Sequence, residues 1–399
     1  MEYRITDKIK NLEANAIREI FGLLKAPGMI SFAGGFPAAE ALPVAEVEKI
    51  ASELLSGEDT LAILQYGGTE GYGPLINSAL KYAARFGIKE TSENNALIIS
   101  GGQQGIDLTF KAFLNKGDRV LVEDPTYLAC LHILKTYEGE PIGVKADSDG
   151  VNIEDLEEKI KRFNPKIVYL IPDFSNPTGK SLSLEKRKAA AALAEKYNVI
   201  VLEDNPYGEL RYSGERLPAI KAFDNAGRVI YVSSFSKTIA PGLRTGIAVA
   251  DEYLIKKLTI CKQAVDVHTP TLSQAIVDRY LRKGLLQPHL DEIIPLYRTK
   301  KEAMTAAIAR CMPEEIKFTN PDGGLFIWGE FSVPFDTGAA FKEAAETTRA
   351  AYVPGKPFFA DGLRSDALRF NFSNSTLAQI EEGVKRLADF FKSKLAKKY

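Results

Sequence analysis

The sequence has few of the residues that build disulfide frameworks and metal centres. Its 399 residues include three cysteines, Cys130, Cys261 and Cys311, which stand far apart and form no CxxC pair. The three histidines show no spacing typical of metal ligands. We therefore expect neither a disulfide framework nor a bound metal ion.

The chain also lacks an excess of charge and long hydrophobic runs. Its formal net charge is -1 at pH 7, so no basic excess is available to displace counterions from a nucleic-acid backbone. No apolar run approaches the ~18 residues of a membrane span, and the first residues lack the apolar core of a signal peptide. We expect a cytoplasmic protein without a nucleic-acid or membrane partner.

Short apolar runs alternate with helical patterns between about residues 95 and 250. Strands that alternate with helices form parallel sheets covered by those helices. The order therefore predicts an α/β fold, with a mostly parallel seven-stranded sheet and helices on both faces. The seven runs are Ala96–Ile99, Arg119–Val122, Ile142–Val144, Ile167–Ile171, Val199–Leu202, Val229–Val232 and Gly246–Ala250.

The C-terminal part follows a different pattern, in which a helical stretch around Leu272–Arg310 precedes three strand candidates and a last amphipathic helix. This pattern predicts a smaller α+β domain, with the first residues of the chain packed near it. We place the large domain at 45–285 and the small domain at 1–44 and 286–399. The strand candidates are Gly323–Glu330, Ala351–Pro354 and Leu368–Ser373, and the helix runs from Thr376 to about Lys394.

Five of the apolar runs are followed by a polar or glycine-bearing cluster. One such cluster would be an ordinary turn, but the carboxyl ends of parallel strands meet at one edge of a sheet, where ligands bind. Five clusters from the same sheet therefore predict a site. They are Ser100–Gly105, Glu123–Tyr127, Ser175–Gly179, Glu203–Tyr207 and Ser233–Lys237.

Lys237 lies among hydroxyl side chains, including Ser234 and Ser236, and seven residues before Arg244. A lysine amine can form an imine with an aldehyde, and hydroxyls with a guanidinium suit a phosphate. The combination suggests a phosphorylated aldehyde cofactor held beside an amine. The ordinary role of a lysine is a solvated surface charge, so this interpretation depends on the other clusters.

Each of the other clusters offers a chemical group. Gly102–Gln103 opens a helix, whose backbone N–H groups can receive a phosphate. Tyr127 can lie against a flat ring, and Asn176 can donate an amide hydrogen bond. Asp204 needs a positive partner, such as a protonated ring nitrogen, and Tyr207 can hydrogen-bond a phenolate-like oxygen. A tight turn, a packed tyrosine, a β-turn and a helix cap are the ordinary alternatives.

Two runs are similar to motifs of other enzyme classes. Phe174–Ser181 ends like a nucleotide-binding P-loop, but its first glycine is replaced by phenylalanine and a proline removes a backbone donor. Ser234–Lys237 fits the Ser-x-x-Lys pattern of serine β-lactamases, yet neither Lys-Thr-Gly nor a secretory signal accompanies it. We therefore set both interpretations aside.

Together, Lys237 with its preceding serines and following Arg244, the Asn176–Gly179 run and the Asp204–Tyr207 run resemble the fold-type I pyridoxal-phosphate aminotransferases of class I/II. The resemblance covers nearly the whole chain and is strongest to the 2-aminoadipate and kynurenine aminotransferase branch. It implies the transferase fold of that family, with the large domain binding the cofactor.

The resemblance implies pyridoxal 5'-phosphate as the cofactor, and Lys237, Asp204 and Tyr207 as catalytic residues. Lys237 would hold the cofactor covalently and transfer a proton, while Asp204 would keep the ring nitrogen protonated. Tyr207 and Asn176 would hydrogen-bond the ring oxygen, and Tyr127 would stack on the ring. The residues implied for the phosphate are Gly102, Gln103, Ser234, Ser236 and Arg244.

The family pattern also implies contacts with the substrate and with a second subunit. Tyr66 would reach the phosphate from a neighbouring subunit, which implies a homodimer with shared active sites. Arg369 would clamp the substrate α-carboxylate through a bidentate pair, with Gly35 and Asn176 completing that pocket. Arg18 would meet a distal acidic group of the substrate.

The activity implied is transfer of an amino group to a 2-oxo acid such as 2-oxoglutarate. The donor would be an α-amino acid with an aromatic, 2-aminoadipate-like or kynurenine-like side chain. Two alternatives keep the cofactor. One is a lyase or decarboxylase on the same fold, because the protein decides which bond breaks. The other is a regulatory protein that binds the cofactor without turnover, although such regulators carry a winged helix before this fold.

Overall fold

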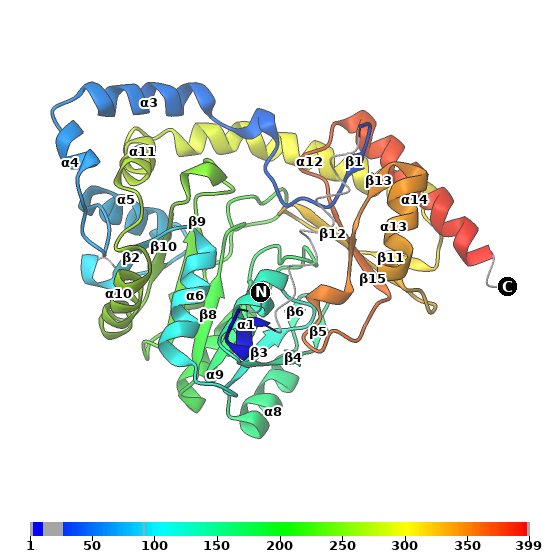
Figure 1. Ribbon diagram of the computed structural model, residues 1–399, viewed down its shortest axis with the longest axis horizontal. Helices are drawn as coiled ribbons and strands as arrows, with labels where there is room; N and C mark the ends of the chain where they lie inside the picture. Colours follow the sequence, from blue (N-terminus) through cyan, green and yellow to red (C-terminus); the bar gives the residue numbers. More distant parts are fainter. Residues whose placement is uncertain (1–2, 11–26, 91, 397–399) are drawn as a thin grey trace.

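The computed structural model describes residues 3–10, 27–90 and 92–396, and its centre is a seven-stranded sheet (Figure 1). The strand order is β2-β10-β9-β8-β7-β3-β4. Only β10 runs antiparallel to its neighbours, so the mostly parallel sheet is confirmed. The strands are β2 (Ala96–Ile99), β3 (Arg119–Glu123), β4 (Glu140–Val144), β7 (Ile167–Leu170), β8 (Ile200–Asp204), β9 (Val229–Ser234) and β10 (Gly246–Val249).

Helices cover both faces of this sheet, because alternate side chains of each buried strand point to opposite faces. On one face Leu121 and Val168 pack with residues of α8 and α9 such as Leu156. On the other face Val122 lies in the same core cluster as Ile106 of α6. The helices around the sheet are α5 (Gly73–Ala84), α6 (Gly102–Phe113), α7 (Leu128–Thr136), α8 (Ile153–Phe163), α9 (Leu184–Tyr197) and α10 (Glu252–Asp266).

A second, four-stranded antiparallel sheet of order β11-β12-β15-β14 is built from the C-terminal part. Here one prediction was wrong: Ala351–Pro354 is not a single strand. Its two halves pair with different partners, β13 with β1 and β14 with β15. The strands are β1 (Ile30–Ser31), β11 (Ile316–Phe318), β12 (Phe326–Phe331), β13 (Ala350–Ala351), β14 (Val353–Pro354) and β15 (Ala367–Asn371).

The β1 and β13 pair brings residues 30–31 to the C-terminal part. The long stretch after residue 270 is two helices, since Gly284 has a left-handed φ of +69° that ends the first of them. The domain limits of 45 and 285 stay a prediction. The remaining helices are α1 (Asp7–Lys10), α3 (Val44–Ser56), α4 (Thr60–Leu64), α11 (Thr271–Arg282), α12 (Leu286–Cys311), α13 (Thr337–Thr348) and α14 (Leu377–Ala396).

None of the helices among the described residues is long and apolar enough to cross a membrane.

Candidate active site

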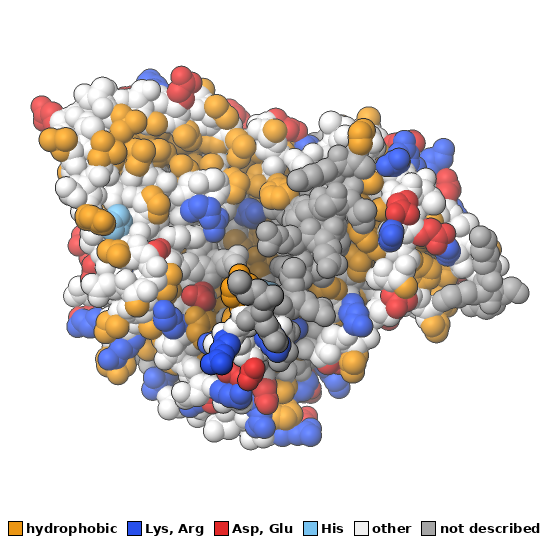
Figure 2. Space-filling model, in the orientation of Figure 1, with side chains coloured by type: hydrophobic (Ala, Val, Ile, Leu, Met, Phe, Trp, Pro, Cys, Tyr) orange, Lys and Arg blue, Asp and Glu red, His pale blue; other side chains and the backbone are white. Residues whose placement is uncertain are grey.

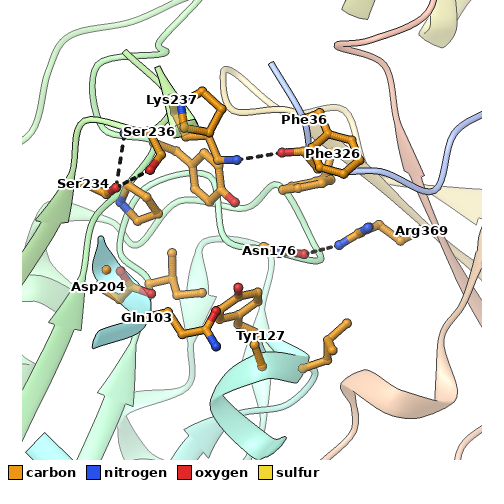
Figure 3. A pocket seen from close by; sticks show the side chains of 18 of the residues that line it. Phe36, Gln103, Tyr127, Asn176, Asp204, Ser234, Ser236, Lys237, Phe326 and Arg369 are labelled. Carbon is orange, nitrogen blue, oxygen red and sulfur yellow. Dashed lines mark hydrogen bonds between the residues drawn. The ribbon is translucent and has the colours of Figure 1, made fainter. Parts of the chain in front are cut away.

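A cavity of about 510 Å³ lies at the carboxyl ends of the central strands, where the polar clusters were predicted to meet (Figure 3). The structure brings together side chains from five strand ends, from the segment after β1 and from β15. The predicted site residues in its lining are Gly35, Gly102, Gln103, Tyr127, Asn176, Asp204, Tyr207, Ser234, Ser236, Lys237, Arg244 and Arg369.

Lys237 follows β9 by three residues and reaches across the cavity. Its Nζ donates to the carbonyl oxygen of Gly35 at 2.7 Å. Burial, and then the positive charges of Arg244 and Arg369, lower the pKa of the Lys237 amine to about 8. A substantial share of these amines is therefore neutral near physiological pH, which a lysine needs in order to act as a nucleophile or base.

The N-terminus of α6 and the end of β9 form one side of the cavity. Ser234 and Ser236 lie 2.9 Å apart through their hydroxyl oxygens, and Arg244 donates to the Ser100 carbonyl at 3.0 Å. Gly101 caps the helix with a φ of +84°, and a Cβ there would come within 2.5 Å of the Arg244 guanidinium. Backbone N–H groups, hydroxyls and a cation thus converge in a form that suits a phosphate.

Asp204 is the last residue of β8 and is 4% exposed. Tyr169 on β7 donates its hydroxyl to Asp204 Oδ2 at 2.8 Å. Burial raises the pKa of Asp204 to about 6, and the Tyr169 hydrogen bond opposes that rise. No salt bridge to Asp204 occurs within the described part of the chain, so this buried carboxylate is suited to a cationic ligand group.

Asp204→Asn is expected to make the ligand-free protein more stable at pH 7, by ~3 kcal/mol. Folding raises the carboxyl pKa from 3.8 to about 6, and each pKa unit is worth ~1.4 kcal/mol. Below pH 3.8 the carboxyl is protonated in both states, so the gain should be absent there and complete above about pH 6. Urea unfolding of both ligand-free proteins at pH 3.5 and 7 measures this, and an equal gain at both pH values contradicts it.

Arg369 lies on β15 and is 2% exposed. Its guanidinium donates to Asn176 Oδ1 at 2.8 Å and to the Ala33 carbonyl at 2.7 Å, and stacks 4.4 Å from the Phe326 ring centroid. Its Nε is buried without a partner, and burial lowers the Arg369 pKa to about 10. A buried guanidinium bonded only to neutral oxygens is suited to an incoming carboxylate.

Tyr127 and Tyr207 line the cavity between Asp204 and Arg369. Burial, followed by the negative charge of Asp204, raises the pKa of Tyr127 to about 12. Burial likewise raises the pKa of Tyr207, whose ring contacts Phe326 edge to face at 5.8 Å. Both phenols therefore stay protonated at neutral pH and can donate hydrogen bonds.

Two predicted residues are not in this lining. Tyr66 follows α4, is 83% exposed, and contacts only His268 among the aromatic rings of the described residues, at 6.0 Å. One chain alone therefore does not bring Tyr66 to the cavity. Arg18 lies outside the described residues.

Sequence reasoning missed several residues of the site. Tyr169 had a detectable signal, because a tyrosine in the apolar strand Ile167–Leu170 needs a hydroxyl partner and the next strand ends in an aspartate. Phe36, His132 and Phe326 line the cavity without a comparable signal. Their places depend on how distant segments pack, which residue spacing does not show.

A family model described as aminotransferase class I and II matches residues 28–387. At 40% identity, the aromatic-amino-acid aminotransferase 1 of Thermococcus litoralis aligns with 99% of this chain and 96% of its own length. The 2-aminoadipate transaminase of Thermus thermophilus is 37% identical over 96% of both chains. The solved structure of a Pyrococcus horikoshii kynurenine aminotransferase with PMP superposes with a TM-score of 0.94, at 39% identity and 98% coverage of each chain.

The cavity has a complementary group for each part of pyridoxal phosphate. The helix N-terminus with Arg244 suits the phosphate, the carboxylate of Asp204, which forms no salt bridge within the described residues, suits a protonated pyridine nitrogen, and the amine of Lys237 suits an aldehyde. The fold, the cavity and the matched family model agree. The chain belongs to the class I and II aminotransferases, and it is a transaminase that depends on pyridoxal phosphate.

Proposed function

We propose that this enzyme transfers the amino group of an α-amino acid with a large, aromatic or kynurenine-like side chain to a 2-oxo acid such as 2-oxoglutarate. A 2-aminoadipate-like donor is the second candidate. The observation that carries the proposal is the placement of Lys237 between two cations, Arg244 at the phosphate side and Arg369 at the substrate side. The names of the relatives support the same range of donors.

Lys237 acts as both nucleophile and base. Bound pyridoxal phosphate supplies an aldehyde for the amine and a ring that accepts the electron pair left when the α-proton is removed. Once the substrate amine had displaced it, the free Nζ of Lys237 would take the proton from the substrate α-carbon and return it to the carbon of the former aldehyde. Its pKa of about 8 allows it to take up and release a proton near neutral pH.

Asp204 holds a proton on the ring nitrogen, because a buried carboxylate without a cation of its own stabilises a positive partner. Tyr169 keeps Asp204 ionised and oriented through its 2.8 Å hydrogen bond. Tyr207 and Asn176 line the cavity and would hydrogen-bond the ring oxygen, and Tyr127 would stack on the ring. Together these groups would hold the ring in one orientation within reach of Lys237.

The phosphate is held by Ser234, Ser236, Arg244 and the N-terminus of α6, where Gly102 offers only its backbone. A Cβ at Gly102 would lie 3.4 Å from Asp204 Oδ1, an ordinary contact. Gly102→Ser is therefore expected to fold normally and to add a hydroxyl donor, lowering the Kd for the cofactor about fivefold. Fluorescence titration of the apoprotein measures this, and an unchanged or raised Kd contradicts the assignment of Gly102 to the phosphate site.

Arg369 binds the α-carboxylate of the substrate. Its Asn176 contact fixes the guanidinium, and its unpartnered Nε offers a further donor. Gly35 leaves room beside it, since a Cβ there would come within 3.3 Å of the Phe326 ring. The substrate is thus anchored at one end while Lys237 meets its α-carbon.

The wall that receives the donor side chain is formed by the first turns of α7 and the segment after β1. Phe36, Leu128 and Ala129 make it largely apolar, and His132 is the only ionisable side chain on it among the described residues. A neutral aromatic group fits such a wall, whereas a distal carboxylate would lose hydration without a strong cation from the described residues in return.

A panel of amino donors tests this proposal. With one 2-oxo acid held constant, we expect phenylalanine, tyrosine and kynurenine to show kcat/KM values at least about tenfold above that of 2-aminoadipate. Transfer is followed by the new oxo acid formed. The reverse order would favour the 2-aminoadipate-like donor, and release of ammonia or CO2 instead of transfer would contradict a transaminase.

We also propose a cytoplasmic homodimer in which Tyr66 completes the site of the neighbouring subunit. Apolar side chains gather over α3 and α4 (Figure 2), where Val44, Leu61 and Leu64 are exposed. Leu61 and Leu64 lie within five residues of Tyr66 in the sequence. Exposed apolar surface of this kind favours burial against a second copy. Sedimentation of the holoenzyme as a monomer would contradict the proposal.

A further inference from the structure

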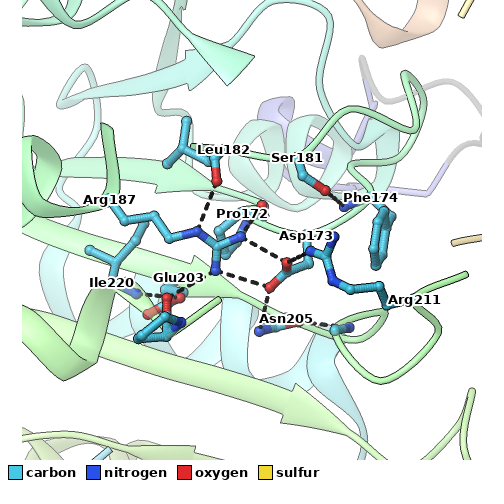
Figure 4. Close-up of polar contacts among 12 residues, drawn as sticks. Pro172, Asp173, Phe174, Ser181, Leu182, Arg187, Glu203, Asn205, Arg211 and Ile220 are labelled. Atoms are coloured by element: carbon cyan, nitrogen blue, oxygen red, sulfur yellow. Dashed lines mark hydrogen bonds and ion pairs between the residues drawn. The ribbon is translucent and has the colours of Figure 1, made fainter. Parts of the chain in front are cut away.

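Arg187 of α9 is fully buried, and every N–H of its guanidinium has a partner (Figure 4). Nε donates to the Leu182 carbonyl at 2.9 Å. The two terminal nitrogens donate to both oxygens of Asp173, at 2.7 and 3.2 Å, and to the carbonyls of Pro172 and Pro218 at 2.8 and 3.0 Å. These five hydrogen bonds hold the bidentate pair of Arg187 and Asp173 in a single geometry.

Asp173 accepts hydrogen bonds from two residues besides Arg187. Its Oδ2 also accepts from Asn205 Nδ2 at 3.1 Å, and its Oδ1 accepts from Arg211 Nη2 at 3.2 Å. The carboxylate is 2% exposed, so these four charged or polar contacts take the place of water. One buried carboxylate therefore joins the segment after β7, the helix α9 and the segment after β8.

The segments after β7 and after β8 both carry residues of the active site. Asp173 stands three residues before Asn176, which contacts Arg369. Asn205 directly follows Asp204, and its Oδ1 accepts the Gly208 N–H at 2.9 Å, so the turn that contains Tyr207 is closed by the same side chain. Displacing Asp173 would move the loops of both ring-oxygen residues.

A third segment is held through Arg211. Its guanidinium lies 4.7 Å from the centroid of the Phe174 ring, and its backbone pairs with Gly323. Phe174 has a left-handed φ of +50°, and a Cβ on Gly323 would come within 2.3 Å of its ring. The segment that leads into β12, and so to Phe326 in the cavity wall, is packed against the same cluster.

We propose that Asp173 is a positioning residue for the transamination: held by Arg187, Asn205 and Arg211, its carboxylate sets the places of Asn176 and Tyr207 against the ring oxygen of the cofactor. This inference rests on the cofactor roles proposed above and adds a residue that does not touch the ligand. Loss of the carboxylate should weaken the hydrogen bonds to the ring oxygen, which stabilise its anionic form.

The test is Asp173→Asn, studied as holoenzyme and as apoprotein. We expect the pH midpoint of the absorbance change of the bound cofactor to rise by about one unit. When the anionic form of the ring oxygen is less stabilised, the bound cofactor loses its proton only at a higher pH. The Kd for pyridoxal phosphate should rise about tenfold. The kcat should fall ~100-fold, the cost of reacting groups misplaced by about 1 Å.

The matched control is Asp224→Asn. The side chain of Asp224 is 2% exposed, against 3% for that of Asp173; it accepts from Lys221 Nζ at 2.9 Å and from the N–H groups of Arg228 and Val229, and it does not line the cavity. Both variants should lose thermal stability, but only Asp173→Asn should change the pH midpoint and the Kd. If the two variants behave alike in both readouts, Asp173 is merely structural and the inference is wrong.

Arg211→Met keeps the proposal testable if Asp173→Asn does not fold. Arg211 is partly exposed, and methionine retains an apolar stem over Phe174 while removing the bond to Asp173. The pH midpoint should shift in the same direction by a smaller amount, and no shift would overturn the inference. The pH-dependent absorbance must be present in the wild type and must vanish in Lys237→Ala. If the wild type lacked this absorbance, the proposed function would be contradicted instead.

Discussion

Lys237→Ala is expected to remove the absorbance of covalently bound cofactor and to lower kcat by at least ~10⁴-fold. The substitution deletes both the amine that joins the aldehyde and the base that moves the α-proton, and acid–base catalysis alone is worth up to ~10⁴-fold. Phosphate contacts through Arg244 and the α6 N-terminus remain, so the variant should still bind pyridoxal phosphate, but noncovalently. Absorbance spectra before and after borohydride reduction, with turnover assays, measure both losses.

Lys180→Ala is the control for general effects of losing a lysine. Its Nζ donates to the Asp147 carbonyl at 2.8 Å, and its side chain does not line the cavity. This variant should keep the spectrum and nearly the wild-type kcat. Retention of reducible cofactor or of turnover in Lys237→Ala would contradict the assignment of Lys237, because no other lysine lines the cavity within the described residues.

The placement of Lys237 was predictable from local patterns. Apolar runs with β-branched residues predict strands, and parallel strands direct their carboxyl ends to one edge. Asp204 ends β8 and Lys237 follows β9, and these consecutive parallel strands are neighbours in the sheet, so the two side chains converge at the edge that the strand pattern predicts. The roles of the side chains came instead from the family resemblance, since spacing alone leaves turns and caps as alternatives.

Other features depended on tertiary contacts that the sequence does not display. Arg187 stands in a run rich in alanine, lysine and glutamate, which is typical of a solvated helix face, yet it is fully buried because Asp173 and three carbonyls satisfy its donors. Ala351–Pro354 reads as one strand, but its halves pair with segments more than 300 and about 15 residues away in sequence. Partner choice at such distances is set by packing.

Arg369→Ala is expected to raise the KM for the amino donor ~100 to 10,000-fold while changing the Kd for pyridoxal phosphate less than about threefold. The variant loses two charge-assisted hydrogen bonds to the α-carboxylate, worth ~1.5 to 3 kcal/mol each. It also removes a positive charge that lowers the Lys237 pKa, so that pKa should rise from about 8. The acidic limb of the pH profile of kcat/KM, along which the amine loses its proton, reports this change, and cofactor titration reports the Kd.

Arg369→Lys separates charge from geometry. A lysine keeps a positive charge near Asn176 but offers no planar pair of donors, so the KM should lie between those of wild type and Arg369→Ala, while the pKa of Lys237 stays near about 8. If instead Arg369→Ala weakened cofactor binding and left the donor KM unchanged, the buried guanidinium would belong to the cofactor site. The α-carboxylate would then require another cation, and the described lining offers only Lys237, Arg244 and His132 for that role.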